Sequence, residues 1–99
     1  MPLSHTAIEK EMGISRAEFF RVATRFLEGR NHFVTDDGFV VEEGGKTLEA
    51  TVTKLEDRTL TPNMVLPRLI AHFSFTGHDN DEVRDLIAIL DRHFQRGGG

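Results

Sequence analysis

The chain has 99 residues, a formal net charge of −4 and no cysteine. A chain of this length corresponds to one domain, and without cysteine it has no disulfide, thiolate metal ligand or thiol nucleophile. The acidic balance argues against an electrostatic nucleic-acid binder, which usually presents a basic face. No apolar stretch approaches the ~20 residues that a membrane span requires, and no signal peptide is recognised. We therefore expect a small acidic protein of the cytoplasm with no membrane contact.

The first predicted element is a short helix over residues 4–12. Ser4 is placed to cap its first turn, and Gly13 supplies a stop. A helix of fewer than ~12 residues is marginal in isolation. We expect this segment either to dock on the rest of the domain or to fray.

A stronger helix is predicted over residues 15–28. Ser15 and Glu18 have the spacing of a capping box, and Gly29 supplies the stop. Apolar residues recur at helical spacing, namely Phe19, Val22, Ala23, Phe26 and Leu27. This amphipathic pattern predicts a helix with one buried side.

A β-hairpin is predicted over residues 38–54, with Gly44-Gly45 as its two-residue turn. Such a turn places Glu43 opposite Lys46, and the register that follows gives one apolar face and one mostly polar face. The apolar face holds Phe39, Val41, Leu48, Ala50 and Val52. The preceding residues 32–35 are either a separate short strand or an extension of the hairpin.

Residues 56–67 are predicted to form a connector, because Pro62 and Pro67 interrupt it and Thr61-Pro62-Asn63 is typical of a turn. Residues 68–76 then alternate as a strand does, with Leu69, Ala71, Phe73 and Phe75 on one face.

The last predicted helix spans residues 79–95, and residues 96–99 are predicted to form a flexible tail. Asp79 and Glu82 have the spacing of a capping box. The apolar positions of this helix follow its period, namely Val83, Leu86, Ile87, Leu90 and Phe94.

The expected fold class is α+β, with the element order α-α-β-β-β-α. We predict a three-stranded antiparallel meander with the two longer helices packed on one face. In this arrangement Phe39, Leu48 and Phe73 lie together beneath Phe26 and Leu90.

The order of the last five elements resembles that of a double-stranded-RNA-binding domain, and the resemblance is one of topology over most of the chain. That family is characterised by a basic cluster at the start of its last helix, which binds phosphates. Residues 79–82 here read Asp-Asn-Asp-Glu. Three negative charges would repel a phosphate backbone, so RNA binding is not the function that we favour.

The candidate binding surface is the face of the predicted sheet opposite the core. It consists of Val40, Glu49, Thr51, Arg68, Ile70, His72 and Ser74. One interpretation is a surface for a peptide or small molecule, with Val40 and Ile70 as its apolar centre. A second is a solvated face, which needs only polar, β-prone residues. A third is dimerisation, in which two such faces stack.

No catalytic, metal or cofactor site is predicted. His72 and Ser74 share a strand face, but same-face neighbours lie roughly 6.5 Å apart, beyond a nucleophile–base hydrogen bond. The potential metal donors match no zinc or calcium signature. These donors are His72, His78, His93, Asp79 and Asp81.

The sequence ends in three glycines. This ending resembles that of ubiquitin-like modifiers and sulfur-carrier proteins, in which an activating enzyme threads a terminal Gly-Gly to reach the carboxylate. Those families end in a strand, whereas a predicted helix precedes the glycines here. Gly98 and Gly99 are the candidate residues for such a role, and a helix stop with a flexible end is the simpler interpretation.

We therefore expect a small binding or accessory module rather than an enzyme. It would act through protein–protein contacts, or as a homodimer, on the exposed sheet face. A carrier or modifier protein that acts through Gly98 and Gly99 is the alternative, and an RNA-binding domain is less favoured.

Overall fold

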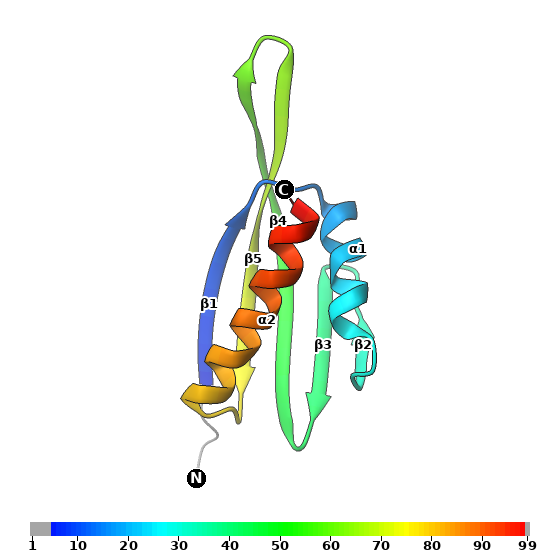
Figure 1. Cartoon of the computed structure of the whole chain (residues 1–99), viewed down its shortest axis with the longest axis vertical. Helices are drawn as coiled ribbons and strands as arrows, with labels where there is room; N and C mark the ends of the chain where they lie inside the picture. Colours follow the sequence, from blue (N-terminus) through cyan, green and yellow to red (C-terminus); the bar gives the residue numbers. More distant parts are fainter. Residues whose placement is uncertain (1–4, 99) are drawn as a thin grey trace.

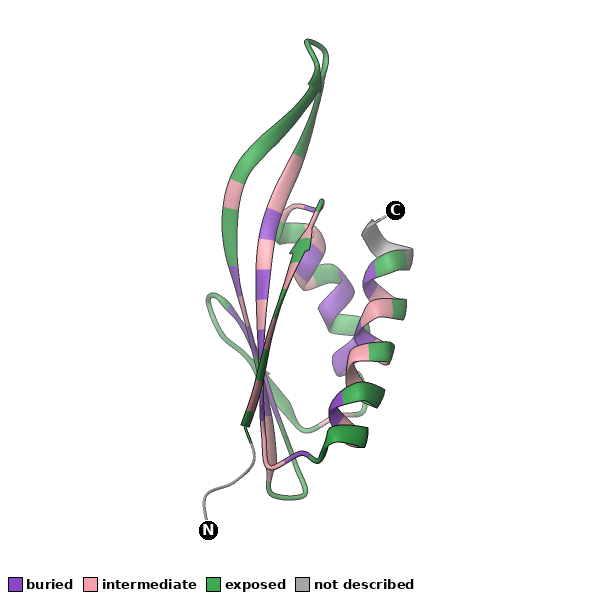
Figure 2. Ribbon diagram, turned by 90° about the vertical axis from the view of Figure 1, so that its left-hand side faces the viewer, coloured by how far each residue is buried: buried purple, intermediate pink, exposed green. Residues whose placement is uncertain are grey.

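The computed structural model describes the backbone of residues 5–98 and the side chains of residues 5–95. The elements in chain order are β1 (His5–Met12), α1 (Arg16–Leu27), β2 (His32–Val34), β3 (Gly38–Glu43), β4 (Lys46–Thr61), β5 (Met64–Thr76) and α2 (Asn80–Gly98). The strands form one antiparallel sheet with the order β1-β5-β4-β3-β2. Both helices lie on one side of the sheet, and no part of residues 5–98 covers its other face, which we call the uncovered face (Figure 1, Figure 2).

The predicted three-stranded meander with the order α-α-β-β-β-α is wrong, because the observed order is β-α-β-β-β-β-α. Residues 5–12 form a strand rather than a helix, and β1 pairs with β5 along its whole length. Ile8 and Met12 lie four residues apart, a spacing that puts both side chains on one side of either a helix or a strand. A paired strand is favoured here, because β5 supplies hydrogen-bonding partners that a short isolated helix lacks. Ser4, the predicted helix cap, lies outside the described residues.

The topology of a double-stranded-RNA-binding domain is not matched either. Four strands, rather than three, lie between α1 and α2, and a further strand precedes α1. The extra strand between the helices is β2, which pairs with β3 so that Phe33 lies opposite Val40. Of the two alternatives for this segment, the separate short strand is the one observed.

The predicted connector over residues 56–67 is strand on both sides of a turn at Pro62-Asn63, since β4 continues to Thr61 and β5 begins at Met64. Register shifts between Leu55 and Arg58 and between Thr59 and Thr61 interrupt the alternation that would reveal a strand in the sequence. We call residues 55–67 the arm. It projects beyond the helices, so that the molecule measures 54 Å along its long axis and 25 × 23 Å across (Figure 1).

The register predicted for the glycine hairpin is confirmed, with Glu43 opposite Lys46 and Phe39 opposite Ala50. Gly44 and Gly45 have φ angles of +58° and +76°. A two-residue turn that matches the twist of its strands requires such angles, and glycine adopts them without steric cost.

The core lies between the helices and the covered sheet face. Phe19 of α1 is fully buried, and its ring stacks on Phe39 and Phe94 at centroid distances of 6.2 and 5.1 Å. The predicted central group is confirmed as part of one buried cluster, namely Phe26, Phe39, Leu48, Phe73 and Leu90. Aromatic side chains of both helices pack in this core. Their packing holds both helices on the same side of the sheet.

The cap predicted at Ser15 and the capping box predicted for Asp79 and Glu82 are present, although at α1 only the hydrogen bond to the Ser15 side chain is formed. Oγ of Ser15 accepts a hydrogen bond from the Glu18 backbone N–H at 3.1 Å. At α2, the Glu82 N–H donates to Oδ1 of Asp79 at 2.8 Å, while the Asp79 N–H donates to Oε1 of Glu82 at 3.0 Å. This reciprocal pair is a complete capping box and sets the start of α2.

The α2 helix continues to Gly98, through residues that were predicted to form a flexible tail, and Gly99 lies outside the described residues. Over residues 5–98, neither helix combines the length and the apolar character needed to cross a membrane.

Candidate functional site

The uncovered sheet face is built from rows of side chains that run across the strands. The longest row crosses all five strands and consists of Phe33, Val40, Glu49, Ser74 and Ala7, in order from β2 to β1. Directly opposed residues in antiparallel strands have Cβ atoms about 4.5–5.5 Å apart, so consecutive members of the row are neighbours.

Shorter rows follow along the strands toward the arm. They are Thr51–His72–Glu9, Thr53–Ile70–Glu11 and Leu55–Arg68. The structure therefore brings all seven residues predicted for the binding surface onto one continuous face, which spans β3, β4 and β5.

Two acidic residues of β1 lie beside the basic residues of this face. Nε of Arg68 donates a hydrogen bond to Oε1 of Glu11 at 3.0 Å. Nδ1 of His72 lies 3.6 Å from Oε1 of Glu9. Pairs as exposed as these contribute little to stability, but they place charges of both signs at defined positions on the face.

Sequence reasoning missed the part of this face that lies on β1 and β2, namely Ala7, Glu9, Glu11 and Phe33. Three of them lie on β1, which was predicted to be helical. A usable signal was the placement of His5, Glu9 and Glu11 on odd positions, away from Ile8 and Met12, as a strand of period two requires. In β1, exposed and half-buried residues alternate in the same way.

Val40 is not the accessible apolar contact that was predicted. It is only 8% exposed, whereas Phe33, directly opposite it on β2, is 52% exposed. At this end of the face Phe33 is therefore the side chain that a partner can reach, and Val40 supports the sheet beside it. Ile70 is half-buried.

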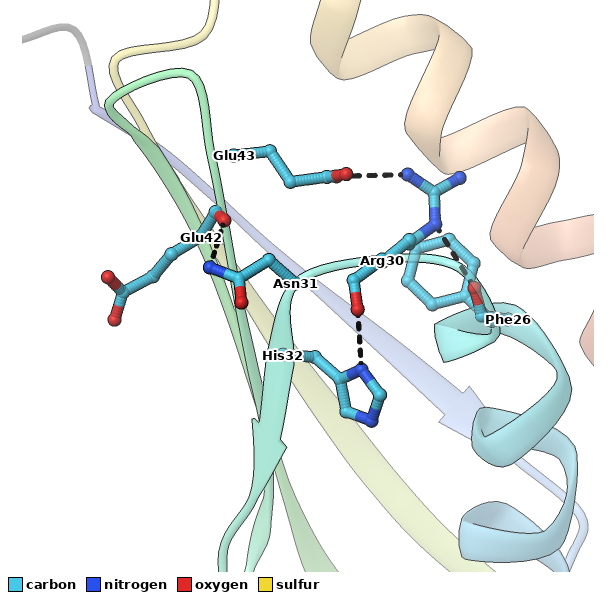
Figure 3. Close-up of polar contacts among 6 residues, drawn as sticks. All are labelled: Phe26, Arg30, Asn31, His32, Glu42 and Glu43. Carbon is cyan, nitrogen blue, oxygen red and sulfur yellow. Dashed lines mark hydrogen bonds and ion pairs between the residues drawn. The ribbon is translucent and has the colours of Figure 1, made fainter.

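The position of β2, and with it Phe33, is set by contacts at the end of α1 (Figure 3). Nε of Arg30 donates to the carbonyl oxygen of Phe26 at 3.1 Å, and its guanidinium carbon lies 4.5 Å from the centroid of the Phe26 ring. Nη1 of Arg30 donates to Oε1 of Glu43 at 3.2 Å. Arg30 thus connects the end of α1 to the end of β3.

The next two residues attach β2 itself (Figure 3). Nδ2 of Asn31 donates to the carbonyl oxygen of Glu42 at 3.0 Å, and the Glu42 N–H donates to the Asn31 carbonyl at 2.9 Å. Nδ1 of His32 lies 2.8 Å from the carbonyl oxygen of Arg30. The two contacts between Asn31 and Glu42 hold a strand of only three residues against β3.

A concavity of about 370 Å³ lies on the helix side, between the β3–β4 turn and the start of α2. Among the residues that line it, Glu82 already binds Lys46 and the Asp79 N–H, and Glu43 binds Arg30. Its buried histidine, His78, packs edge-on against Phe75, and its Nδ1 has no hydrogen-bond partner. Most of the charged groups here are therefore satisfied within the chain.

No metal centre is formed by residues 5–95, since no three histidine, aspartate or glutamate side chains gather as a metal requires. The potential donors weighed from the sequence do not gather at one point. His72 lies on the uncovered face, His93 lies 6.0 Å from Phe26 between ring centroids, and His78 is buried beside Phe75. Asp79 and Asp81 belong to the start of α2, where Asp79 caps the helix.

No protein-family model matches the sequence, and a comparison with curated proteins gives no match.

Proposed function

We propose that this chain is a small protein-binding module whose contact surface is the uncovered sheet face. One observation carries this proposal: both helices pack on the same side of a five-stranded sheet, so nothing in residues 5–98 covers the other side (Figure 2). Domains are usually built from layers that cover one another, and an exposed face with apolar side chains is typical of an interaction site.

The chemistry of the face favours a protein as the partner. Phe33 and Ile70 offer apolar contact, while Arg68 with Glu11 and His72 with Glu9 place polar and charged groups beside Ile70. Protein interfaces combine apolar contacts with a polar rim in this way. Small-molecule sites are concave, whereas a sheet face offers a broad surface.

The test compares wild type with Ile70→Glu, which places a charge in the middle of the face. Arg84→Glu is the control, because Arg84 lies exposed on α2, on the other side of the sheet. A partner isolated with the wild-type protein is purified and titrated calorimetrically against each variant, after circular dichroism has shown that the folds are intact.

We expect Ile70→Glu to weaken binding at least about tenfold, because a desolvated charge at an interface is costly, and Arg84→Glu to leave it unchanged. If the partner is a second copy of the chain, the same difference will appear in sedimentation of the protein alone. Equal binding by all three proteins would exclude this face as the contact surface.

A further inference from the structure

We propose that β1 is a dimerisation edge, at which two copies of this chain pair antiparallel over residues 5–11, with Ile8 opposite Ile8 of the second copy. The contact joins the two sheets into one continuous sheet with all helices on the same side. It goes beyond binding on the uncovered face, because it is made by the backbone of a strand edge and leaves that face open to a partner.

The outer edge of β1 has no strand beside it in the part of the chain that the structure describes. β1 lies at one end of the strand order, and all eight of its residues pair with β5 on the inner side without a register shift (Figure 1). An edge strand presents a row of N–H and C=O groups that can pair with another chain. β1 therefore offers a long and regular edge for pairing.

The other edges of the sheet carry features that disfavour such pairing. β2, at the opposite end of the strand order, is only three residues long. In the arm, two register shifts interrupt β4, and β5 contains Pro67, which has no N–H to donate. Short strands, bulges and prolines are means by which proteins block the edges of their sheets. Residues 5–12 contain none of these features.

The charged side chains of β1 do not protect its edge, because they have partners within the chain. Lys10 forms an ion pair with Asp91 of α2, and Glu11 accepts a hydrogen bond from Arg68 of β5. Glu9 lies beside the histidine opposite it on β5. Charged side chains, lysine above all, deter pairing at an edge strand. Here they are directed onto the chain's own helix and sheet.

The symmetry of the dimer restricts the register. Two copies related by a two-fold axis pair only in registers in which one residue lies opposite its own copy, because directly opposed side chains point to the same face of the sheet. With Ile8 at the axis, the contact covers residues 5–11, and His5 lies opposite Glu11 at both ends. The imidazole of His5 can then donate a hydrogen bond to the carboxylate, and no like charges face each other.

The neighbouring registers are less favourable. An axis at Glu9 places two carboxylates opposite each other, and an axis at Lys10 does the same with two ammonium groups. Like charges directly opposed across two strands are destabilising. An axis at Ala7 shortens the contact within the described residues to 5–9. Charge and length therefore both favour the register with Ile8 at the axis.

The first experiment places one cysteine at a time in the full chain, which has none of its own, as Ala7→Cys, Ile8→Cys or Glu9→Cys. A disulfide requires Cα atoms about 4.4–6.8 Å apart, a range that includes directly opposed residues but not diagonal ones, which lie about 7–8 Å apart. After circular dichroism has shown intact folds, mild oxidation should link Ile8→Cys into dimers at least about tenfold faster than either neighbour.

The second experiment tests the charges at the ends of the contact. His5→Glu places two carboxylates opposite each other at both ends. His32→Glu is the matched control, because it makes the same change on β2, at the opposite edge of the sheet. Sedimentation velocity over a concentration series measures association. We expect dimers of the wild type and the control, and dimerisation at least about tenfold weaker for His5→Glu.

A wild-type chain that stays monomeric across the series would overturn the proposal. So would crosslinking that is fastest at position 7 or 9, or a dimer that His5→Glu weakens no more than His32→Glu does. The same assay with Ile70→Glu separates this contact from binding on the uncovered face. Ile70→Glu should leave the β1 dimer intact. A dimer that Ile70→Glu disrupts and His5→Glu does not would place self-association on the uncovered face and reject pairing through β1.

Discussion

Glu9 and His72 lie directly opposite each other in the β1–β5 pair, with Oε1 of Glu9 3.6 Å from Nδ1 of His72. His72 belongs to the surface that the sequence predicts for binding, while Glu9 comes from a segment predicted to be helical. The uncovered face therefore extends onto a strand that was not expected, and β1 adds carboxylates to it. A partner that contacts His72 also meets Glu9.

Because β1 is a strand, adjacent residues face opposite sides of the sheet. Substitutions at two adjacent residues should therefore differ in their effect on stability. Ile8 packs against the core, and Glu9 points to the uncovered face. We expect Ile8→Gln to lower the free energy of unfolding by roughly 1–3 kcal/mol, because it removes apolar burial. Glu9→Gln should change it by less than about 1 kcal/mol, as is usual for a substitution at an exposed position. Urea denaturation of both variants measures the difference, and equal effects would contradict the alternation of faces.

The one-sided core predicts a large contrast between two phenylalanines. Phe19 is fully buried between Phe39 and Phe94, while Phe33 is 52% exposed on β2. Phe19→Ala should cost about 3–5 kcal/mol of unfolding free energy, since it leaves a cavity among aromatic rings. Phe33→Ala should cost less than about 1 kcal/mol, and its effect should appear in partner binding instead. Thermal unfolding gives both values, and a similar loss for the two would argue against a core confined to the helix side.

The parts of the fold that the sequence predicts well are those in which independent signals agree. In the hairpin, turn length and apolar alternation favour one register, with Glu43 opposite Lys46, and that register is observed. At α2, the capping pair Asp79 and Glu82 and the helical period both indicate the same start. Each signal is local, so it can be read from the sequence without knowledge of tertiary contacts.

The parts that could not be predicted depend on long-range pairing. The spacing of Ile8 and Met12 fits the period of a helix and also that of a strand. Only pairing with the free edge of β5 favours the strand. In the arm, two register shifts and Pro67 disrupt the alternation, so only the pairing of β4 with β5 reveals the strands. The candidate face was incomplete for the same reason, because its missing acidic residues belong to β1.

The capping box of α2 predicts a pH dependence of stability. The pKa of Glu82 is lowered from its ordinary value of 4.5 by the hydrogen bond from the Asp79 N–H and, next, by that from Lys46. A carboxyl with a lowered pKa stabilises the folded state at pH values above 4.5, and this contribution is lost as the pH falls through the folded-state pKa. We therefore expect Glu82→Gln to be less stable than wild type at neutral pH, and the difference to vanish in strong acid. Urea midpoints of both proteins at neutral pH and in strong acid test this prediction. A stability difference that does not change with pH would refute the ionic contribution of Glu82.

The close approach of β3 and β4 predicts that Gly38 cannot be replaced. A Cβ atom at this position would lie 1.7 Å from the carbonyl oxygen of Ala50 and 2.6 Å from its carbonyl carbon. Both are backbone atoms that cannot rotate away, so the strands would have to separate at the point where Val52 bonds to Asp37. We expect Gly38→Ala to lower the free energy of unfolding by at least about 1–3 kcal/mol, as overpacking of a core does.

Gly13→Ala is the matched control for that substitution, because no atom lies within 4 Å of a Cβ atom at position 13. It should leave stability nearly unchanged or raise it slightly, since alanine reduces the conformational freedom of the unfolded chain. Urea denaturation of the two alanine variants gives the comparison. If Gly38→Ala proves as stable as Gly13→Ala, β3 and β4 do not approach each other as closely at this point as the structure requires.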